Sequence, residues 1–185
     1  MKENIDNAIE WLKEQPIKGC ITGSTVLEYF EGADIDLFVY DEASFNKVLF
    51  AMHHSDMFNI TDEREKWKFE KWINQNNKSK FGITTIKFLF NTCIDVNIIL
   101  KKNATNIFSV LSSFDMDIIS KGYDIETKQV LDLSGDSQVT KIASWNKWNP
   151  AFYDPEMWQI SRILRQLERV FKYHDRGYNT DAVVN

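Results

Sequence analysis

The stretch that decides the fold reads Cys20-Ile21-Thr22-Gly23-Ser24 and then, after a spacer, Asp34-Ile35-Asp36-Leu37-Phe38-Val39. The first part is typical of a buried strand that ends in a tight turn. The second part indicates another apolar strand, which carries two acids. Because successive side chains of a strand point to opposite faces, Asp34 and Asp36 should project from the same face.

Two carboxylates side by side in an apolar strand repel each other unless something positive lies between them. Oxygen ligands of this kind suit a divalent cation, Mg²⁺ or Mn²⁺. Gly23 and Ser24 stand where a helix over 24–31 is expected to begin, and the free N–H groups of a helix N-terminus bind phosphate. Either motif alone is more often a solvated turn or loop. Together, in this order, they indicate chemistry on a nucleoside triphosphate.

These residues resemble the signature of the DNA polymerase β-like nucleotidyltransferase superfamily: an apolar residue, Gly, Gly or Ser, a spacer, then Asp-apolar-Asp/Glu-apolar. Thr22 stands where an apolar residue is usual. The resemblance implies that Asp34 and Asp36 are catalytic ligands of two Mg²⁺ ions and that Gly23 and Ser24 hold phosphate. It also implies a third carboxylate on a later strand. The best candidate is Asp95, in Cys93-Ile94-Asp95-Val96-Asn97-Ile98-Ile99-Leu100.

Two later segments carry further hypotheses. Asp115-Met116-Asp117 repeats the acid spacing without a Gly-Ser turn at the right distance, so we interpret it as a strand with polar positions and as the main rival place for a third acid. Segments 114–117 and 169–173 also resemble uncharacterised phage and giant-virus members of the superfamily.

A helix is expected from about 155 to 173. Its basic face includes Arg162 and Arg165, which either remain solvated or bind triphosphate or nucleic-acid phosphate.

Composition and pattern favour an α+β fold: a mixed β-sheet flanked by helices, with a mostly helical C-terminal part. Hydrophobic residues make up 43% of the 185 residues, which is ample for a core. We expect a nucleotidyltransferase-like core over 1–135 and a helical extension over 136–185 packed on it. A hairpin about Asn91-Thr92 should join strands over 83–90 and 93–100. Over 114–123 and 129–133 we expect a strand pair, and over 137–146 a helix.

Charge and segment type limit the function classes. The net charge of −5 argues against a protein that coats nucleic acid. No apolar run reaches membrane-spanning length, and the N-terminus lacks a secretory pattern. We therefore expect a cytoplasmic protein with no membrane partner.

The resulting hypothesis is a Mg²⁺-dependent nucleotidyltransferase that moves a nucleoside monophosphate from an NTP, such as ATP, to an acceptor hydroxyl and releases pyrophosphate. The acceptor, which is RNA, a protein or a small molecule, stays open, as do the base of the donor and the oligomeric state. Two alternatives stay open as well. One is a catalytically inactive binding module with the same fold. The other is a nucleic-acid-binding adaptor that uses the arginine face and the tryptophans.

Overall fold

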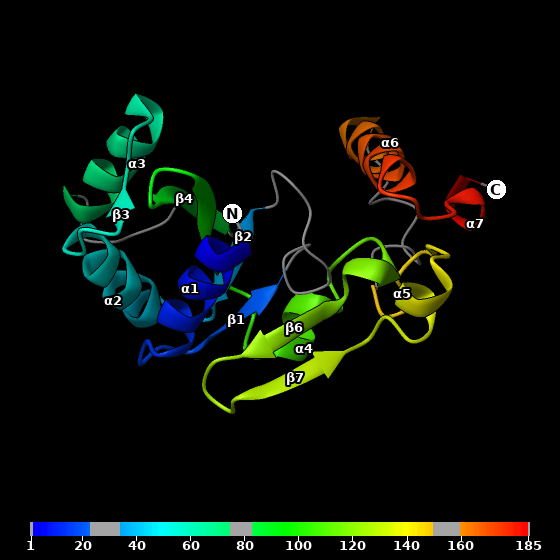
Figure 1. Cartoon of the computed structure of the whole chain (residues 1–185), viewed down its shortest axis with the longest axis horizontal. Coiled ribbons are helices and arrows are strands. Elements are labelled where there is room, and N and C mark those ends of the chain that lie inside the picture. The colour runs from blue at the N-terminus through cyan, green and yellow to red at the C-terminus, as the bar shows by residue number, and fades with distance from the viewer. Residues whose placement is uncertain (1, 23–33, 75–82, 150–159, 185) are drawn as a thin grey trace. The chain divides into compact units, whose positions relative to one another are not determined.

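The computed structural model describes residues 2–22, 34–74, 83–149 and 160–184 (Figure 1). The chain forms two compact units. The first comprises Met1–Ser109 and Gly122–Leu131, and the second comprises Val110–Lys121 and Asp132–Asn185. The single boundary expected after residue 135 therefore differs from the observed division, because the segment 110–121 belongs with the C-terminal residues. The last crossing between the units, after Leu131, lies close to the expected boundary.

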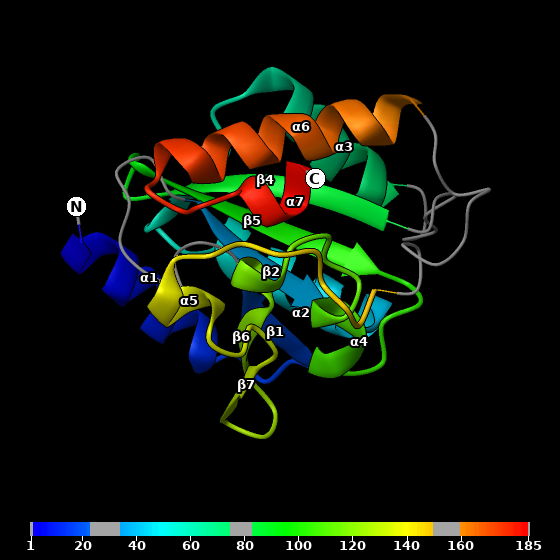
Figure 2. The same cartoon turned by 90° about the vertical axis from the view of Figure 1, so that its right-hand side faces the viewer.

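A seven-stranded sheet is the frame of the first unit, with the strand order β3-β4-β5-β2-β1-β6-β7. The strands are β1 (Gly19–Thr22), β2 (Ile35–Val39), β3 (Phe58–Asn59), β4 (Ile83–Phe90), β5 (Ile94–Lys101), β6 (Lys121–Asp124) and β7 (Gln129–Asp132). β2 and β5 run parallel, whereas β1 is antiparallel to β2 and β4 is antiparallel to β5. Figure 2 shows β4, β5 and β2 side by side. The mixed sheet confirms the expected fold class.

Helices flank this sheet, as the sequence pattern predicts. They are α1 (Lys2–Lys13), α2 (Glu42–His53), α3 (Glu63–Asn74), α4 (Ile107–Leu111), the 3₁₀ helix η2 (Asp117–Ile119), α5 (Ser137–Thr140), α6 (Ile160–Asp175) and α7 (Asp181–Val184). Asp41 caps α2 by accepting the Ser44 N–H at 2.6 Å. At the start of α3, Asp62 Oδ1 accepts the N–H groups of Arg64 and Glu65 at 2.9 and 3.0 Å. None of the helices in the described part of the chain is long and apolar enough to cross a membrane.

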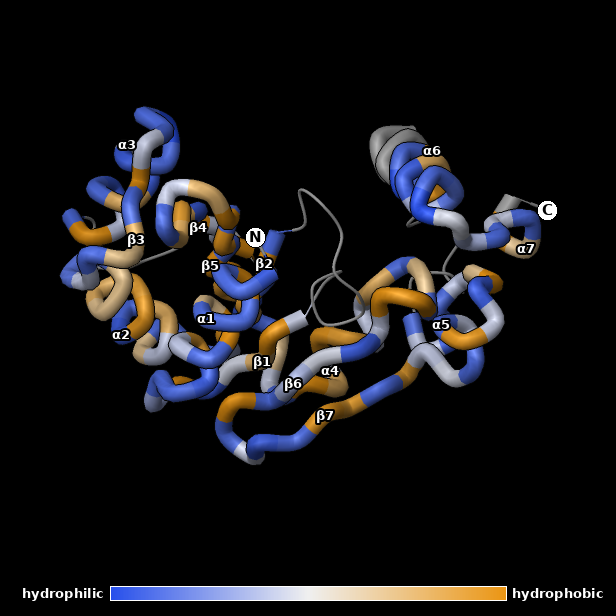
Figure 3. The backbone as a smooth tube through the Cα atoms, in the orientation of Figure 1, coloured by the Kyte–Doolittle hydropathy of each residue, from blue (hydrophilic) through white to orange (hydrophobic). Residues whose placement is uncertain are grey.

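One face of the sheet is apolar and packs against α1 and α2, which lie on the same side of it in Figure 1. Burial alternates along β2 and β5, so every second side chain enters this core. Figure 3 shows hydrophobic residues along β5 and α2. Each large apolar side chain buried in this way contributes about 1.5–3 kcal/mol. The fully buried members from the two strands and α2 are Ile35, Leu37, Val39, Val96, Ile98, Phe45, Val48, Leu49 and Met52.

The hairpin between β4 and β5 turns where the sequence predicts it. Asn91 and Thr92 have φ angles of 45° and 61°, in the left-handed region. Asparagine tolerates this conformation better than most residues. The turn sets the antiparallel register that pairs Lys87 with Asn97.

Two expectations for the second unit are wrong, each for its own physical reason. Residues 114–120 form no strand, and α5 ends at Thr140 rather than near residue 146. The Phe114 carbonyl accepts the side-chain amides of Asn146 and Asn149, both at 3.0 Å, instead of bonding to a neighbouring strand. Lys141, at a left-handed φ of 56°, terminates α5. Sequence patterning does not reveal side-chain amides that substitute for a strand partner.

Asn146 is the polar centre of the second unit. Its side chain is 1% exposed, and Nδ2 donates to the carbonyls of Leu111 and Phe114 and to Ser120 Oγ at 2.9–3.0 Å. Asn146→Ala should lower the free energy of unfolding by about 2 kcal/mol or more, because buried carbonyls lose their donor. Chemical denaturation measures this loss, with Asn103→Ala at an exposed turn as the control. Equal losses of stability in the two variants would contradict the role of Asn146 as the polar centre of the second unit.

The two cysteines differ in environment, which gives a second prediction. Cys20 is buried in β1, and burial raises the pKa of its thiol to about 12, whereas Cys93 is exposed. At pH 8 a thiol reagent should label one cysteine in the native protein and both after unfolding. Above the unfolded pKa of about 9 the unfolded state loses the Cys20 proton first, so stability should fall as the pH rises from about 9 to about 12.

Between about pH 9 and pH 12, the free energy of unfolding should fall by at most about 1.4 kcal/mol per pH unit. Cys20→Ala should remove this part of the alkaline loss, and Cys93→Ala should not. Urea denaturation as a function of pH compares the variants. Fast labelling of both thiols in the native wild type would show that Cys20 is accessible.

Candidate functional site

A row of polar residues crosses four adjacent strands on the face of the sheet opposite the apolar core. The register pairs Thr22 of β1 with Asp36 of β2, Asp36 with Asn97 of β5, and Asn97 with Lys87 of β4. Residues paired in register on neighbouring strands project from the same face. We call these residues the polar row: Thr22, Asp36, Asn97 and Lys87.

The carboxylates of Asp34 and Asp36 converge at the centre of the polar row. Asn97 Nδ2 donates to Asp34 Oδ2 at 3.0 Å and to Asp36 Oδ1 at 2.9 Å. One amide group therefore bridges both carboxylates, and all three side chains are half-buried. The expectation that the two acids share one face is confirmed.

Asp95 lies on the same face of β5 but has a different partner. Lys87 Nζ donates to Asp95 Oδ2 at 3.2 Å, and both side chains are about 40% exposed. Within the described ranges, no three His, Cys, Asp or Glu side chains are grouped so that they could hold a metal ion. The structure thus brings Asn97, not Asp95, to the carboxylate pair. A ligand role for Asp95 stays a prediction.

The structure does not describe the side chains of the other predicted site residues. Gly23 and Ser24, with the helix expected over 24–31, lie outside the described residues. Arg162 and Arg165 belong to α6 in the second unit, and their side chains also lie outside what the structure describes. Their phosphate-binding roles stay predictions.

The rival acids Asp115 and Asp117 have partners inside the second unit. Asp115 Oδ1 accepts from Arg169 Nη1 at 2.7 Å. Asp117 accepts from the Ser137 hydroxyl and from the Ser144 N–H, and burial raises the pKa of its carboxyl. These contacts tie η2 and the loop before it to α5 and α6, so a structural role accounts for both acids.

Thr22 occupies the position at which the sequence departs from the expected signature. Its side chain is fully buried, and its Oγ1 has no hydrogen-bond partner among the described residues. Gly122 of β6 pairs with it, and a Cβ at Gly122 would lie 3.0 Å from Thr22 Cγ2 and from the Ile21 carbonyl oxygen. The glycine thus allows β6 to approach Thr22 closely.

The donor set of the polar row suits a hard divalent cation. Asp34 and Asp36 supply carboxylate oxygens and two negative charges in a half-buried place. Thr22 supplies a hydroxyl that lacks a partner within the described ranges. Oxygen donors of this kind select Mg²⁺ or Mn²⁺ over metals that prefer thiolate or imidazole. The residues therefore fit the cation that the sequence predicts.

Asn97 and Lys87 are the members of the row that sequence reasoning missed. The alternation of β5 already placed Asn97 on the face of Asp95. What the sequence lacked was the offset between β5 and β2, which decides whether residue 95 or residue 97 faces Asp36.

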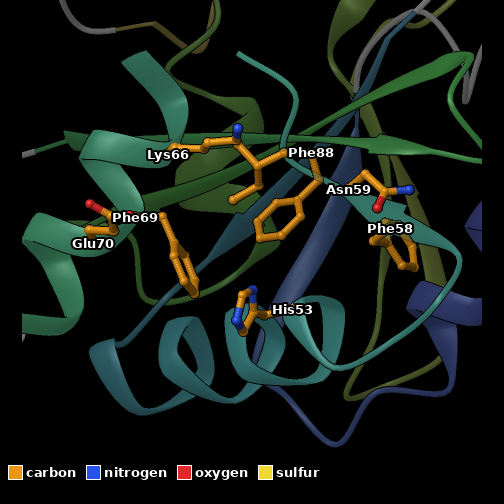
Figure 4. A pocket seen from close by; sticks show the side chains of 8 residues that line it. His53, Phe58, Asn59, Lys66, Phe69, Glu70 and Phe88 are labelled. Atoms are coloured by element: carbon orange, nitrogen blue, oxygen red, sulfur yellow. The ribbon is translucent and has the colours of Figure 1, made fainter. Parts of the chain in front are cut away.

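A separate pocket of about 430 Å³ lies between α2, α3, β3 and β4 (Figure 4). The His53 and Phe69 rings stand 4.8 Å apart on its wall. Phe88 also lines it, and because Phe88 and Lys87 are consecutive in β4 they point to opposite faces of the sheet. This pocket is therefore distinct from the polar row.

Comparisons with known proteins give the fold. No model of a known protein family matches the chain, and no curated protein matches its sequence. Among solved structures, the Thermotoga maritima CCA-adding enzyme complexed with tRNA is similar, with a TM-score of 0.50 and 13% sequence identity. The match covers 89% of this chain and 34% of that one, so the chain spans about a third of that enzyme's length. The chain is thus similar in fold to part of that enzyme.

Proposed function

We propose that this protein is a nucleotidyltransferase that uses Mg²⁺ or Mn²⁺ to transfer a nucleoside monophosphate from an NTP to an acceptor hydroxyl. The observation that carries the proposal is the convergence of Asp34 and Asp36 on one amide, at 3.0 and 2.9 Å. The pair lies on the polar face of a sheet whose fold is similar to that of a CCA-adding enzyme. Fold and carboxylate pair together favour this reaction class over hydrolysis by a serine or cysteine nucleophile.

The reaction exchanges a phosphoanhydride bond of the NTP for a phosphodiester bond to the acceptor. The acceptor oxygen forms a bond to the α-phosphorus, the bond from that phosphorus to the oxygen of the β-phosphate breaks, and pyrophosphate leaves with the bridging oxygen. The acceptor proton passes to solvent. A cation at the site would neutralise the charge on the phosphoryl oxygens.

The chain's own residues hold and orient the reactants. Asp34 and Asp36 would hold the cation, and their half-buried position would strengthen that attraction relative to open water. Gly23 and Ser24 are proposed to hold the triphosphate. Asp95 is proposed to act on the acceptor side, where its pairing with Lys87 keeps its carboxylate oriented. Most of the catalytic effect then comes from positioning.

An RNA hydroxyl is the acceptor to test first, because the similar enzyme is complexed with tRNA. Protein and small-molecule hydroxyls follow. Arg162 and Arg165 of α6 are the proposed phosphate contacts for the donor or the acceptor.

A second candidate function has a specific observation behind it. An amide, rather than a third carboxylate, contacts the acid pair. This arrangement favours a binding module that keeps the fold and has lost turnover. Pyrophosphate release separates the two functions.

The first prediction concerns the acid pair. Pyrophosphate release should be measured with each of the four common NTPs, Mg²⁺ or Mn²⁺, and an RNA acceptor. The double variant Asp34→Asn, Asp36→Asn should reduce the rate on the order of 100-fold or more, because the site loses both charges. Asp56→Asn, which changes an exposed acid, is the control. Unchanged turnover in the double variant would exclude the site, and no release from any NTP would favour the binding module.

The second prediction concerns α6. Arg162→Ala with Arg165→Ala should weaken binding of the triphosphate or of RNA several-fold, and the remaining affinity should depend less steeply on salt. Fluorescence anisotropy at several salt concentrations measures both effects. Lys47→Ala, which removes an exposed charge from α2 in the first unit, is the control. The same affinity and salt slope in all three proteins would show that this face is only solvated.

A further inference from the structure

The side chain of Asn97 does more than fill a place in the polar row. Its NH₂ group has two hydrogens, and the two hydrogen bonds run to different carboxylates, one to Asp34 and one to Asp36. An amide donor that serves both acids offsets the repulsion between them without any net charge. The acid pair can therefore form in the folded chain before a cation arrives.

The place of Asn97 follows from strand register. It lies directly opposite Asp36 across the parallel pair of β2 and β5. Asp95 comes two positions earlier on the same face and contacts Lys87. The side chain nearest the acid pair on β5 is thus neutral, and the acid on the same strand is paired with a cation.

An asparagine amide has a second end. Its Oδ1 is a ligand that hard divalent cations accept, and rotation about the last side-chain bond exchanges Oδ1 with Nδ2 at little cost. With Nδ2 inward, the amide donates to two carboxylates. With Oδ1 inward, it adds a third oxygen to theirs. An aspartate at this position would offer acceptors only and would place three negative charges together.

We infer that Asn97 is a two-state positioning residue, which holds Asp34 and Asp36 together through Nδ2 in the free protein and turns Oδ1 toward a divalent cation when one binds. The inference rests on the cation site of the proposed function. It deepens that function by naming Asn97 as a further oxygen ligand beside the two carboxylates. Compared with an aspartate at this position, the neutral amide should give a lower cation affinity and should let the chain fold without the cation.

Two substitutions separate the two states of the amide. Asn97→Asp keeps the size and an oxygen ligand but removes the donor and adds a charge. Asn97→Leu keeps the approximate size and removes both donor and ligand. Asn103→Asp, at an exposed turn just after β5, adds the same charge away from the site and is the control. Thermal unfolding of the full chain is followed in EDTA and in Mn²⁺, and Mn²⁺ binding is measured by calorimetry.

The expected results differ in sign between the variants. In EDTA, both Asn97 variants should unfold at a lower temperature than wild type. Asn97→Asp should bind Mn²⁺ about tenfold more tightly, since ligand charge sets affinity, and should recover its stability when Mn²⁺ is added. Asn97→Leu should bind Mn²⁺ more weakly than wild type and should not recover.

Several results would overturn the inference. Wild-type stability of Asn97→Asp in EDTA would show that the donor holds nothing. Wild-type Mn²⁺ affinity of Asn97→Leu would show that Oδ1 is no ligand, as would the absence of Mn²⁺ binding to the wild type. If Asn97→Asp folds only with Mn²⁺, the inference is supported. If it fails to fold under both conditions, Asn97→Leu decides alone.

Pyrophosphate release is measured separately from thermal stability and Mn²⁺ affinity. Cation-linked stability without pyrophosphate release would support the role of Asn97 and reject nucleotidyl transfer. Pyrophosphate release that survives in Asn97→Leu with unchanged Mn²⁺ affinity would do the reverse.

Discussion

The parallel pairing of β2 with β5 is the interaction on which the candidate site depends. It brings Asp36 and Asn97, which lie far apart in the sequence, to the same level of the sheet. A shift of one residue would turn Asn97 to the opposite face and leave two half-buried carboxylates without their shared donor. Removing a hydrogen-bond donor from half-buried acceptors costs more than a single surface contact contributes, so the register matters more than any one side chain in the row.

The apolar face of the sheet enforces that register. Ile35, Leu37 and Val39 are fully buried, and α2 covers them with Phe45 and Leu49. A slip would expose these side chains to water and bury acids in their place. The hydrophobic core and the polar row therefore both follow from the alternation of side chains along β2 and β5. Packing of the apolar side chains on one face fixes where the polar side chains lie on the other face.

The two Asp-x-Asp segments show how tertiary context separates identical patterns. Asp34 and Asp36 accept hydrogen bonds from one neutral donor, the side-chain amide of Asn97 on the neighbouring strand. Asp115 is paired with Arg169, and Asp117 accepts from Ser137 and Ser144. The two acids of the second segment thus stabilise their own unit. Spacing alone does not distinguish these cases, because both place two acids two residues apart.

The sequence by itself determined the elements that rest on local chemistry. Alternation predicted β2 and β5, and the place of the hairpin turn at Asn91 and Thr92 was predicted from the residues between the two strands. Only the tertiary structure decided that Asn97 meets the acid pair while Asp95 meets Lys87, and that Asn146 replaces a strand partner in the second unit. These contacts join residues remote in sequence, and their geometry depends on strand offset and packing, which no local pattern encodes.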